Sequence, residues 1–69
     1  MGVEVDARGL SCPEPVMLTM NAMKAHGGEE IKVLVSETAA RDNVKKCAES
    51  KGKKVSVTQK GEDFELLIQ

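Results

Sequence analysis

The chain has 69 residues, which is enough for one small domain with a thin hydrophobic core. Hydrophobic residues make up 41% and charged residues 30% of the chain, a balance typical of a globular domain. The formal net charge of −1 excludes a strong overall field that would attract nucleic acid or anionic lipid. Phe64 is the only aromatic residue, so the chain cannot offer nucleic-acid bases a platform of aromatic side chains.

The sequence also bears on location and cofactors. No apolar run approaches membrane-spanning length, and the N-terminus lacks the pattern of a signal peptide, so we expect a cytoplasmic protein without membrane association. Two cysteines, Cys12 and Cys47, are too few for a disulfide framework and indicate free thiols. Together with His26 they lack the spacing of a zinc site, so we expect no metal and no other cofactor.

The first half of the chain predicts a strand and a helix. Residues 3–7 alternate apolar and polar side chains, as in a strand with one covered face, and Gly9 ends the pattern. From Pro13 to about His26 most residues favour a helix, and a pair of glycines follows. Because proline suits the first turn of a helix, we expect Pro13 to begin it and Cys12 to occupy the cap position.

This first helix has more apolar surface than one covered face requires. Val16, Met20 and Met23 lie on one side and are the expected core face, and a second apolar side consists of Leu18, Ala22 and Ala25. Met17 lies away from the centre of both sides. It is a candidate for partner docking, because methionine suits adaptable interfaces, although helical spacing favours ordinary core packing.

A second strand and a second helix follow. Residues 31–35 are mostly β-branched and predict a strand. Ser36 or Thr38 is the expected cap of a helix that ends near Gly52. Cys47 lies on the apolar stripe of this helix, so we expect a buried core thiol rather than a second reactive one.

The last segment predicts two strands joined by a tight turn. Residues 53–59 and 62–69 alternate apolar and polar side chains around Lys60 and Gly61. The order β-α-β-α-β-β predicts a two-layer α/β (α+β) sandwich with both helices on one face of the sheet. Leu34 and Leu67 would then point to the open face. No linker or repeat divides residues 1–69, so we expect a single domain.

Cys12 has the setting of a reactive thiol. At a helix N-terminus the macrodipole favours the thiolate, Arg8 would lower the thiol pKa further, and Glu14 would raise it. The alternative is a small buried side chain before a helix. The motif has no second cysteine at C-x-x-C spacing, and His26 lies at the far end of the helix, so the thiol has no local resolving partner and no adjacent base. Such a thiolate can still accept and donate sulfur.

Residues 5–15 resemble the signature of the TusA/SirA-like family of small sulfur carriers, which combines an acidic residue, a Gly-Leu pair and Cys-Pro-x-Pro. The resemblance extends over the whole chain, so it implies a TusA-like domain with a mixed four-stranded sheet, in which Cys12 carries a persulfide. We expect the rest of the motif to position this thiol, through Asp6, Arg8, Gly9, Leu10, Pro13, Glu14 and Pro15. The expected protein is a sulfurtransferase-like carrier.

The resemblance also implies partners. A cysteine desulfurase or a rhodanese-like protein would donate sulfur, and a downstream protein would accept it from a carrier that we expect to be monomeric. Residues 37–44 and 48–52 look closest to the TusA-like domain of selenium-metabolism-associated YedF-type proteins. Within them Arg41 and Asp42 match an Arg-Asp pair of the TusA pattern, which is a candidate for partner docking. The alternative is a solvated helix pair of minor energetic weight.

Three other functions remain open from the sequence. The chain could carry selenium instead of sulfur, or Cys12 and Cys47 could form a redox switch. It could also be a regulatory or RNA-binding module, because the implied fold resembles a domain of a translation initiation factor. The near-neutral charge and the single aromatic residue argue against nucleic-acid binding.

Overall fold

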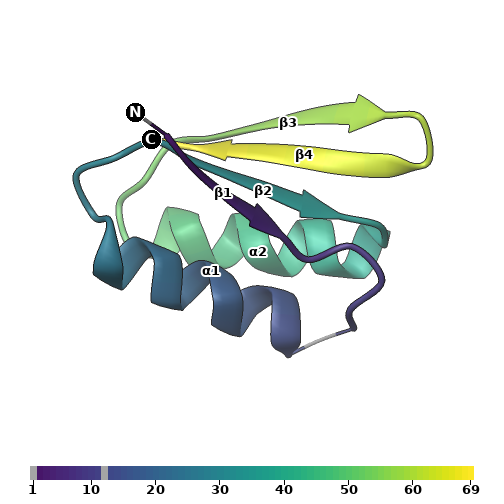
Figure 1. The fold of residues 1–69 in the computed structure, drawn as a ribbon, viewed down its shortest axis with the longest axis horizontal. Coiled ribbons are helices and arrows are strands. Elements are labelled where there is room, and N and C mark those ends of the chain that lie inside the picture. The colour runs from purple at the N-terminus through teal and green to yellow at the C-terminus, as the bar shows by residue number, and fades with distance from the viewer. Residues whose placement is uncertain (1, 12) are drawn as a thin grey trace.

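The computed structural model describes residues 2–11 and 13–69 of the chain; the predictions for Cys12 itself lie outside these ranges. The element order confirms the predicted β-α-β-α-β-β arrangement (Figure 1). The elements are β1 (Val3–Asp6), α1 (Glu14–Ala25), β2 (Ile31–Val35), α2 (Thr38–Ser50), β3 (Val55–Lys60) and β4 (Asp63–Ile68).

The strands form one mixed four-stranded sheet in the order β1-β2-β4-β3. β1 is parallel to β2, whereas β4 is antiparallel to both β2 and β3. Both helices pack on the same face of this sheet, and the opposite face is not covered by any described element (Figure 1). The predicted two-layer sandwich is therefore confirmed.

The strand register separates a core face from an open face. Val33 of β2 pairs with Val5 of β1 and with Leu66 of β4, and both Val33 and Leu66 are fully buried beneath the helices. One residue earlier along β2, Lys32 pairs with Leu67, and both are only partly buried. Because side chains alternate between the two faces of a strand, the alternating hydrophobic pattern fixes this register.

The buried face of α1 differs from the predicted one. Met23 is buried as expected, but Met20 is 44% exposed and Val16 is only partly buried. Pro15 and Thr19 lie in the core instead. The Thr19 hydroxyl donates a hydrogen bond of 2.8 Å to the Pro15 carbonyl. This bond satisfies the buried hydroxyl, so a polar residue can occupy a core position.

The helix starts also differ from prediction. α1 begins at Glu14 with Pro13 at its N-cap position, one residue later than expected. α2 has Glu37 at its N-cap position and no capping hydrogen bond from a side chain, so neither predicted cap, Ser36 or Thr38, performs that role. Ser36 instead accepts a hydrogen bond from the loop between β1 and α1.

Two further details correct the sequence analysis. Cys47 is free and only partly buried, packed against the edge of the core rather than enclosed in it. The hairpin turn consists of Gly61 and Glu62, one residue later than expected, because Lys60 pairs with Asp63 as the last residues of the two strands. Gly61 has a φ of +64°, which suits the first central position of a two-residue hairpin turn.

Neither described helix could cross a bilayer. α1 has 12 residues and α2 has 13, whereas a spanning helix needs about 20 predominantly apolar residues.

Candidate functional site

The loop that connects β1 to α1 contains the motif, and it lies at the carboxyl end of the two parallel strands. The Ala7 amide donates to the Leu34 carbonyl at 2.8 Å, which extends the pairing of β1 and β2 by one residue. The Leu10 amide then donates to the Ala7 carbonyl at 3.3 Å. Between them Gly9 has a φ of +79°, a conformation that glycine adopts readily and other residues rarely do. The motif glycine is therefore required by the turn itself.

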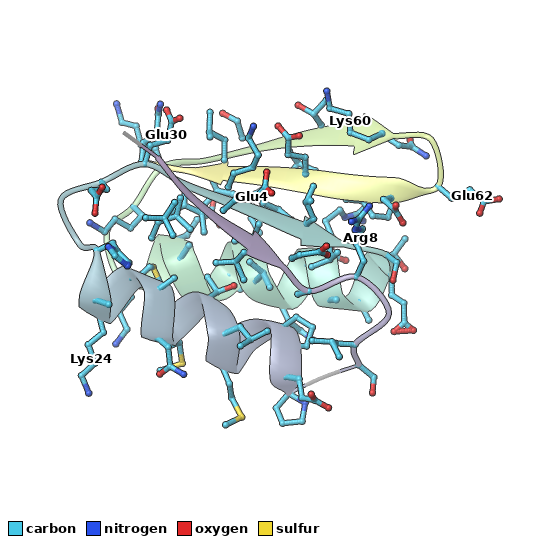
Figure 2. The ribbon with its side chains drawn as sticks, viewed as in Figure 1. Glu4, Arg8, Lys24, Glu30, Lys60 and Glu62 are labelled. Carbon is cyan, nitrogen blue, oxygen red and sulfur yellow. The ribbon has the colours of Figure 1, made fainter. Side chains whose placement is uncertain are left out.

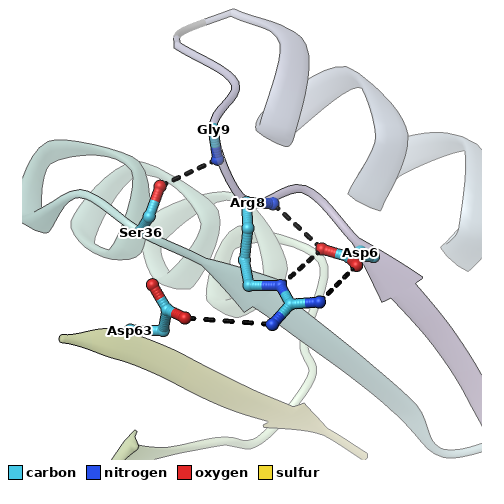
Figure 3. A network of polar contacts seen from close by, with 5 residues as sticks. All are labelled: Asp6, Arg8, Gly9, Ser36 and Asp63. Carbon is cyan, nitrogen blue, oxygen red and sulfur yellow. Dashed lines mark hydrogen bonds and ion pairs between the residues drawn. The ribbon is translucent and has the colours of Figure 1, made fainter. Parts of the chain in front are cut away.

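An arginine ties this loop to two strands (Figure 3). Arg8 donates to both carboxylate oxygens of Asp6, from Nε at 2.9 Å and from Nη2 at 2.7 Å. The Arg8 backbone amide also donates to Asp6 at 3.2 Å. On its other side the guanidinium lies 3.9 Å from a carboxylate oxygen of Asp63, at the start of β4. The guanidinium thus joins the motif loop to the hairpin.

This pairing changes how Asp6 titrates. Hydrogen bonds from the Arg8 side chain, and then from its backbone amide, lower the pKa of Asp6 to about 2. Because the pKa is depressed in the folded protein, the pairing contributes stability above the ordinary value of 3.8, and that contribution is lost as pH falls towards 2. We expect carboxyl-carbon NMR to give a midpoint near 2 for Asp6 in the wild type, and a midpoint near the ordinary value in Arg8→Gln. A normal midpoint in the wild type would contradict the bidentate pairing.

A serine from the next loop holds the motif glycine in place. The Gly9 amide donates a hydrogen bond of 2.8 Å to the hydroxyl oxygen of Ser36, which directly follows β2 (Figure 3). Because β1 and β2 are parallel, their carboxyl ends lie at the same edge of the sheet, and this brings the two loops together. Ser36 therefore fixes the motif loop instead of capping α2.

We expect Ser36→Ala to loosen the motif loop. Loss of one hydrogen bond of about 1 kcal/mol should speed hydrogen exchange of the Gly9 amide roughly fivefold, measured by NMR at constant pH. Ser56→Ala on the exposed strand β3 is the matched control and should leave that rate unchanged. An unchanged Gly9 rate in Ser36→Ala would show that the hydroxyl does not restrain the loop.

The rest of the motif joins the loop to the core and to α1. Pro15 is fully buried and Leu10 packs against the core, so both residues anchor the connection between β1 and α1. The Ser11 carbonyl accepts the Glu14 amide at 3.0 Å, and the Pro13 carbonyl accepts a helical amide at 3.0 Å. The motif residues that the structure describes thus form one continuous connection from β1 to α1, in which Ser11, Pro13 and Glu14 are exposed to solvent.

The predicted pair on α2 lies close to the same edge of the sheet. Arg41 Nε donates to Asp42 Oδ1 at 3.0 Å, and its guanidinium carbon lies 4.8 Å from the centre of the Phe64 ring. Phe64 directly follows Asp63, the residue that faces Arg8. The start of β4 therefore contacts both arginines, and Arg41 is held by a ring as well as by a carboxylate.

Met17 lies on the outer side of α1, 55% exposed, close in sequence to Leu18 and Met20, which are also exposed. The core-packing interpretation of Met17 is therefore wrong, and its docking role stays a prediction.

Sequence reasoning missed two members of this site, Ser36 and Asp63. Ser36 is 27 residues from its partner Gly9, and only the parallel pairing of β1 with β2 reveals their proximity. Nothing in the sequence distinguishes Asp63 from the other polar residues of the predicted hairpin. Within residues 2–11 and 13–69, no three histidine, cysteine or acidic side chains form a cluster that could hold a metal ion.

Comparison with known proteins supports the same family as the motif. The chain is similar to the SirA-like protein from Desulfitobacterium hafniense, whose crystal structure superposes with a TM-score of 0.89. The two sequences are 31% identical, and the alignment covers 99% of this chain and 95% of that one. No match was found among curated proteins. The family model described as Sulfurtransferase TusA matches residues 3–69, so the chain belongs to the TusA family of sulfur-transfer proteins.

Proposed function

We propose that this chain carries sulfur as a persulfide on Cys12, between a donor protein and an acceptor protein. The observation that carries the proposal is the position of Cys12 in a Cys-Pro-Glu-Pro motif, in a chain that belongs to the TusA family. The expected donor is a cysteine desulfurase or a rhodanese-like protein. The acceptor is a second protein with a nucleophilic sulfur.

The surrounding framework supports a reactive thiol at this position. α1 begins at Glu14, so the positive end of its dipole lies close in sequence to Cys12 and favours a thiolate there. The loop before the motif cysteine is fixed by Arg8 and by the hydrogen bond between Gly9 and Ser36. A fixed loop limits the entropy lost when a partner engages the thiol.

The proposed transfer is an exchange that needs no external oxidant. The Cys12 thiolate attacks the outer sulfur of the donor persulfide, a new S–S bond forms, and the donor S–S bond breaks. The donor leaves as a thiolate, so one thiolate is consumed and one is released. A nucleophile of the acceptor then attacks the outer sulfur on Cys12, and Cys12 returns to the thiolate.

The described residues favour a carrier over a self-sufficient catalyst. His26, the only histidine, lies at the C-cap of α1 and pairs with Glu29 at 2.8 Å. It is therefore at the opposite end of the helix from the motif and cannot act as a general base there. We infer that donor and acceptor supply the groups that complete each transfer.

Intact-mass spectrometry tests this proposal. After incubation of the folded protein with a cysteine desulfurase and cysteine, we expect a mass increase of one sulfur atom that dithiothreitol reverses. A parallel reaction with a rhodanese and thiosulfate distinguishes the two donor classes. Absence of an adduct with both donors would contradict the carrier function.

A further inference from the structure

A groove on the helical layer, lined in part by Lys24, lies away from Arg8 of the motif loop (Figure 2). It is formed by the second half of α1 and the connection from α2 to β3, and its lining residues are Met20, Asn21, Met23, Lys24, Lys51 and Lys53. We call it the lysine groove. Its volume of about 370 Å³ is within the range of roughly 300–1,000 Å³ that binding pockets occupy.

The lysine groove combines an apolar floor with a cationic rim. Met23 is 8% exposed and forms part of the core, whereas Met20 is 44% exposed beside it. Lys24, Lys51 and Lys53 supply three ammonium groups, and no acidic residue is part of the lining. A ligand that matched this surface would present an apolar group between negative charges.

The cationic rim is held by backbone geometry. Lys53 Nζ donates to the Gly27 carbonyl at 2.8 Å, which joins the connection before β3 to the loop after α1. Gly52, with a φ of +79°, turns the chain between Lys51 and Lys53. The side chains of Lys24 and Lys51 form no ion pair with the acidic residues that the structure describes. Their charges are available to a ligand.

The occupant that fits best is a segment of a partner protein. Because Met20 in its wall is 44% exposed, the groove is too open to enclose a small molecule in the way that tight ligand sites do. A methionine wall adapts well to peptide side chains. The groove begins about six residues into α1, which is roughly 9 Å along the helix from Glu14.

We propose that the lysine groove binds an acidic peptide segment of a protein partner, with an apolar side chain on Met20 and Met23 and carboxylates at Lys24 and Lys51. The site is separate from the motif loop, so such a segment can stay bound while another part of the partner reaches the loop. Tethering of this kind raises the local concentration of the partner without any new contact at the thiol.

An NMR titration with a defined probe tests the proposal. The probe is an end-blocked hexapeptide of alternating glutamate and leucine, added to isotope-labelled protein at low salt. We expect shifts concentrated on the backbone amides of the lysine groove, with affinity that falls as salt is added. The variant Lys24→Gln/Lys51→Gln should bind at least about threefold more weakly.

Matched controls make each outcome decisive. Lys32→Gln/Lys60→Gln removes two charges from the sheet, outside the groove, and should bind the probe as the wild type does. Cys12→Ser should bind equally well, which separates this proposal from the carrier function. Equal binding of a glutamine-leucine peptide would overturn the proposal. Shifts elsewhere on the protein, no binding at millimolar peptide, or binding to phosphatidylglycerol vesicles but not to the peptide would also overturn it.

Discussion

Cys12→Ser is expected to abolish the gain of a sulfur atom from a cysteine desulfurase, whereas Cys47→Ser should load to the wild-type extent. A serine hydroxyl is not ionised near neutral pH and cannot displace the donor thiolate, so no persulfide forms. Cys47 belongs to α2 and is partly buried against the core, away from the motif. The measurement is intact mass after a fixed time with desulfurase and cysteine, followed by peptide mapping of the adduct.

The paired cysteine variants also separate the competing functions. Equal loading of Cys12→Ser and the wild type would contradict the proposed role of Cys12 as the carrier. Loss of loading in Cys47→Ser alone would assign that role to Cys47. If both single variants remained partly loaded, each thiol would carry sulfur. Far-ultraviolet circular dichroism should show that both variants are folded, so that a loss of loading reports the thiol and not the fold.

The fold could be predicted where side-chain periodicity is dictated by burial. The strands are predictable because β2 and β4 place Val33 and Leu66 under the helices, which requires an apolar residue at every second position. The buried face of α1 was predicted wrongly because hydrophobicity alone ranked Met20 above Thr19. In the structure, the hydrogen bond from Thr19 to Pro15 removes the cost of burying the hydroxyl, a local compensation that composition does not reveal.

The candidate site was predictable only as far as it is local in sequence. Asp6, Arg8 and Gly9 lie within four consecutive positions, so the motif locates all three, although the ion pair between Asp6 and Arg8 was not predicted. Strand pairing brings Ser36 and Asp63 to the same loop, and a search for sequence motifs cannot detect that pairing. The charge of Arg8 was expected to act on the thiol. In the structure the two carboxylates that flank the guanidinium already compensate this charge.

The core beneath the helices is thin, so removal of one buried side chain should lower the free energy of unfolding substantially. Leu66 is fully buried in β4, the strand between β2 and β3, and its register partner on β2 is the fully buried Val33. Deletion of a buried leucine side chain costs about 2–5 kcal/mol, from lost burial and the cavity left behind. A domain of this length has a free energy of unfolding of about 3–10 kcal/mol. At the middle of both ranges, Leu66→Ala is therefore expected to remove about half of it.

Urea unfolding followed by far-ultraviolet circular dichroism measures this loss, because the chain has no tryptophan or tyrosine to report by fluorescence. Leu67→Ala is the matched control: it removes the same atoms one residue later, on the open face, and should cost about 1 kcal/mol or less. Equal midpoints for the two variants would mean that both faces of the sheet are covered to the same degree. That result would contradict the two-layer arrangement, in which only the face beneath α1 and α2 is buried.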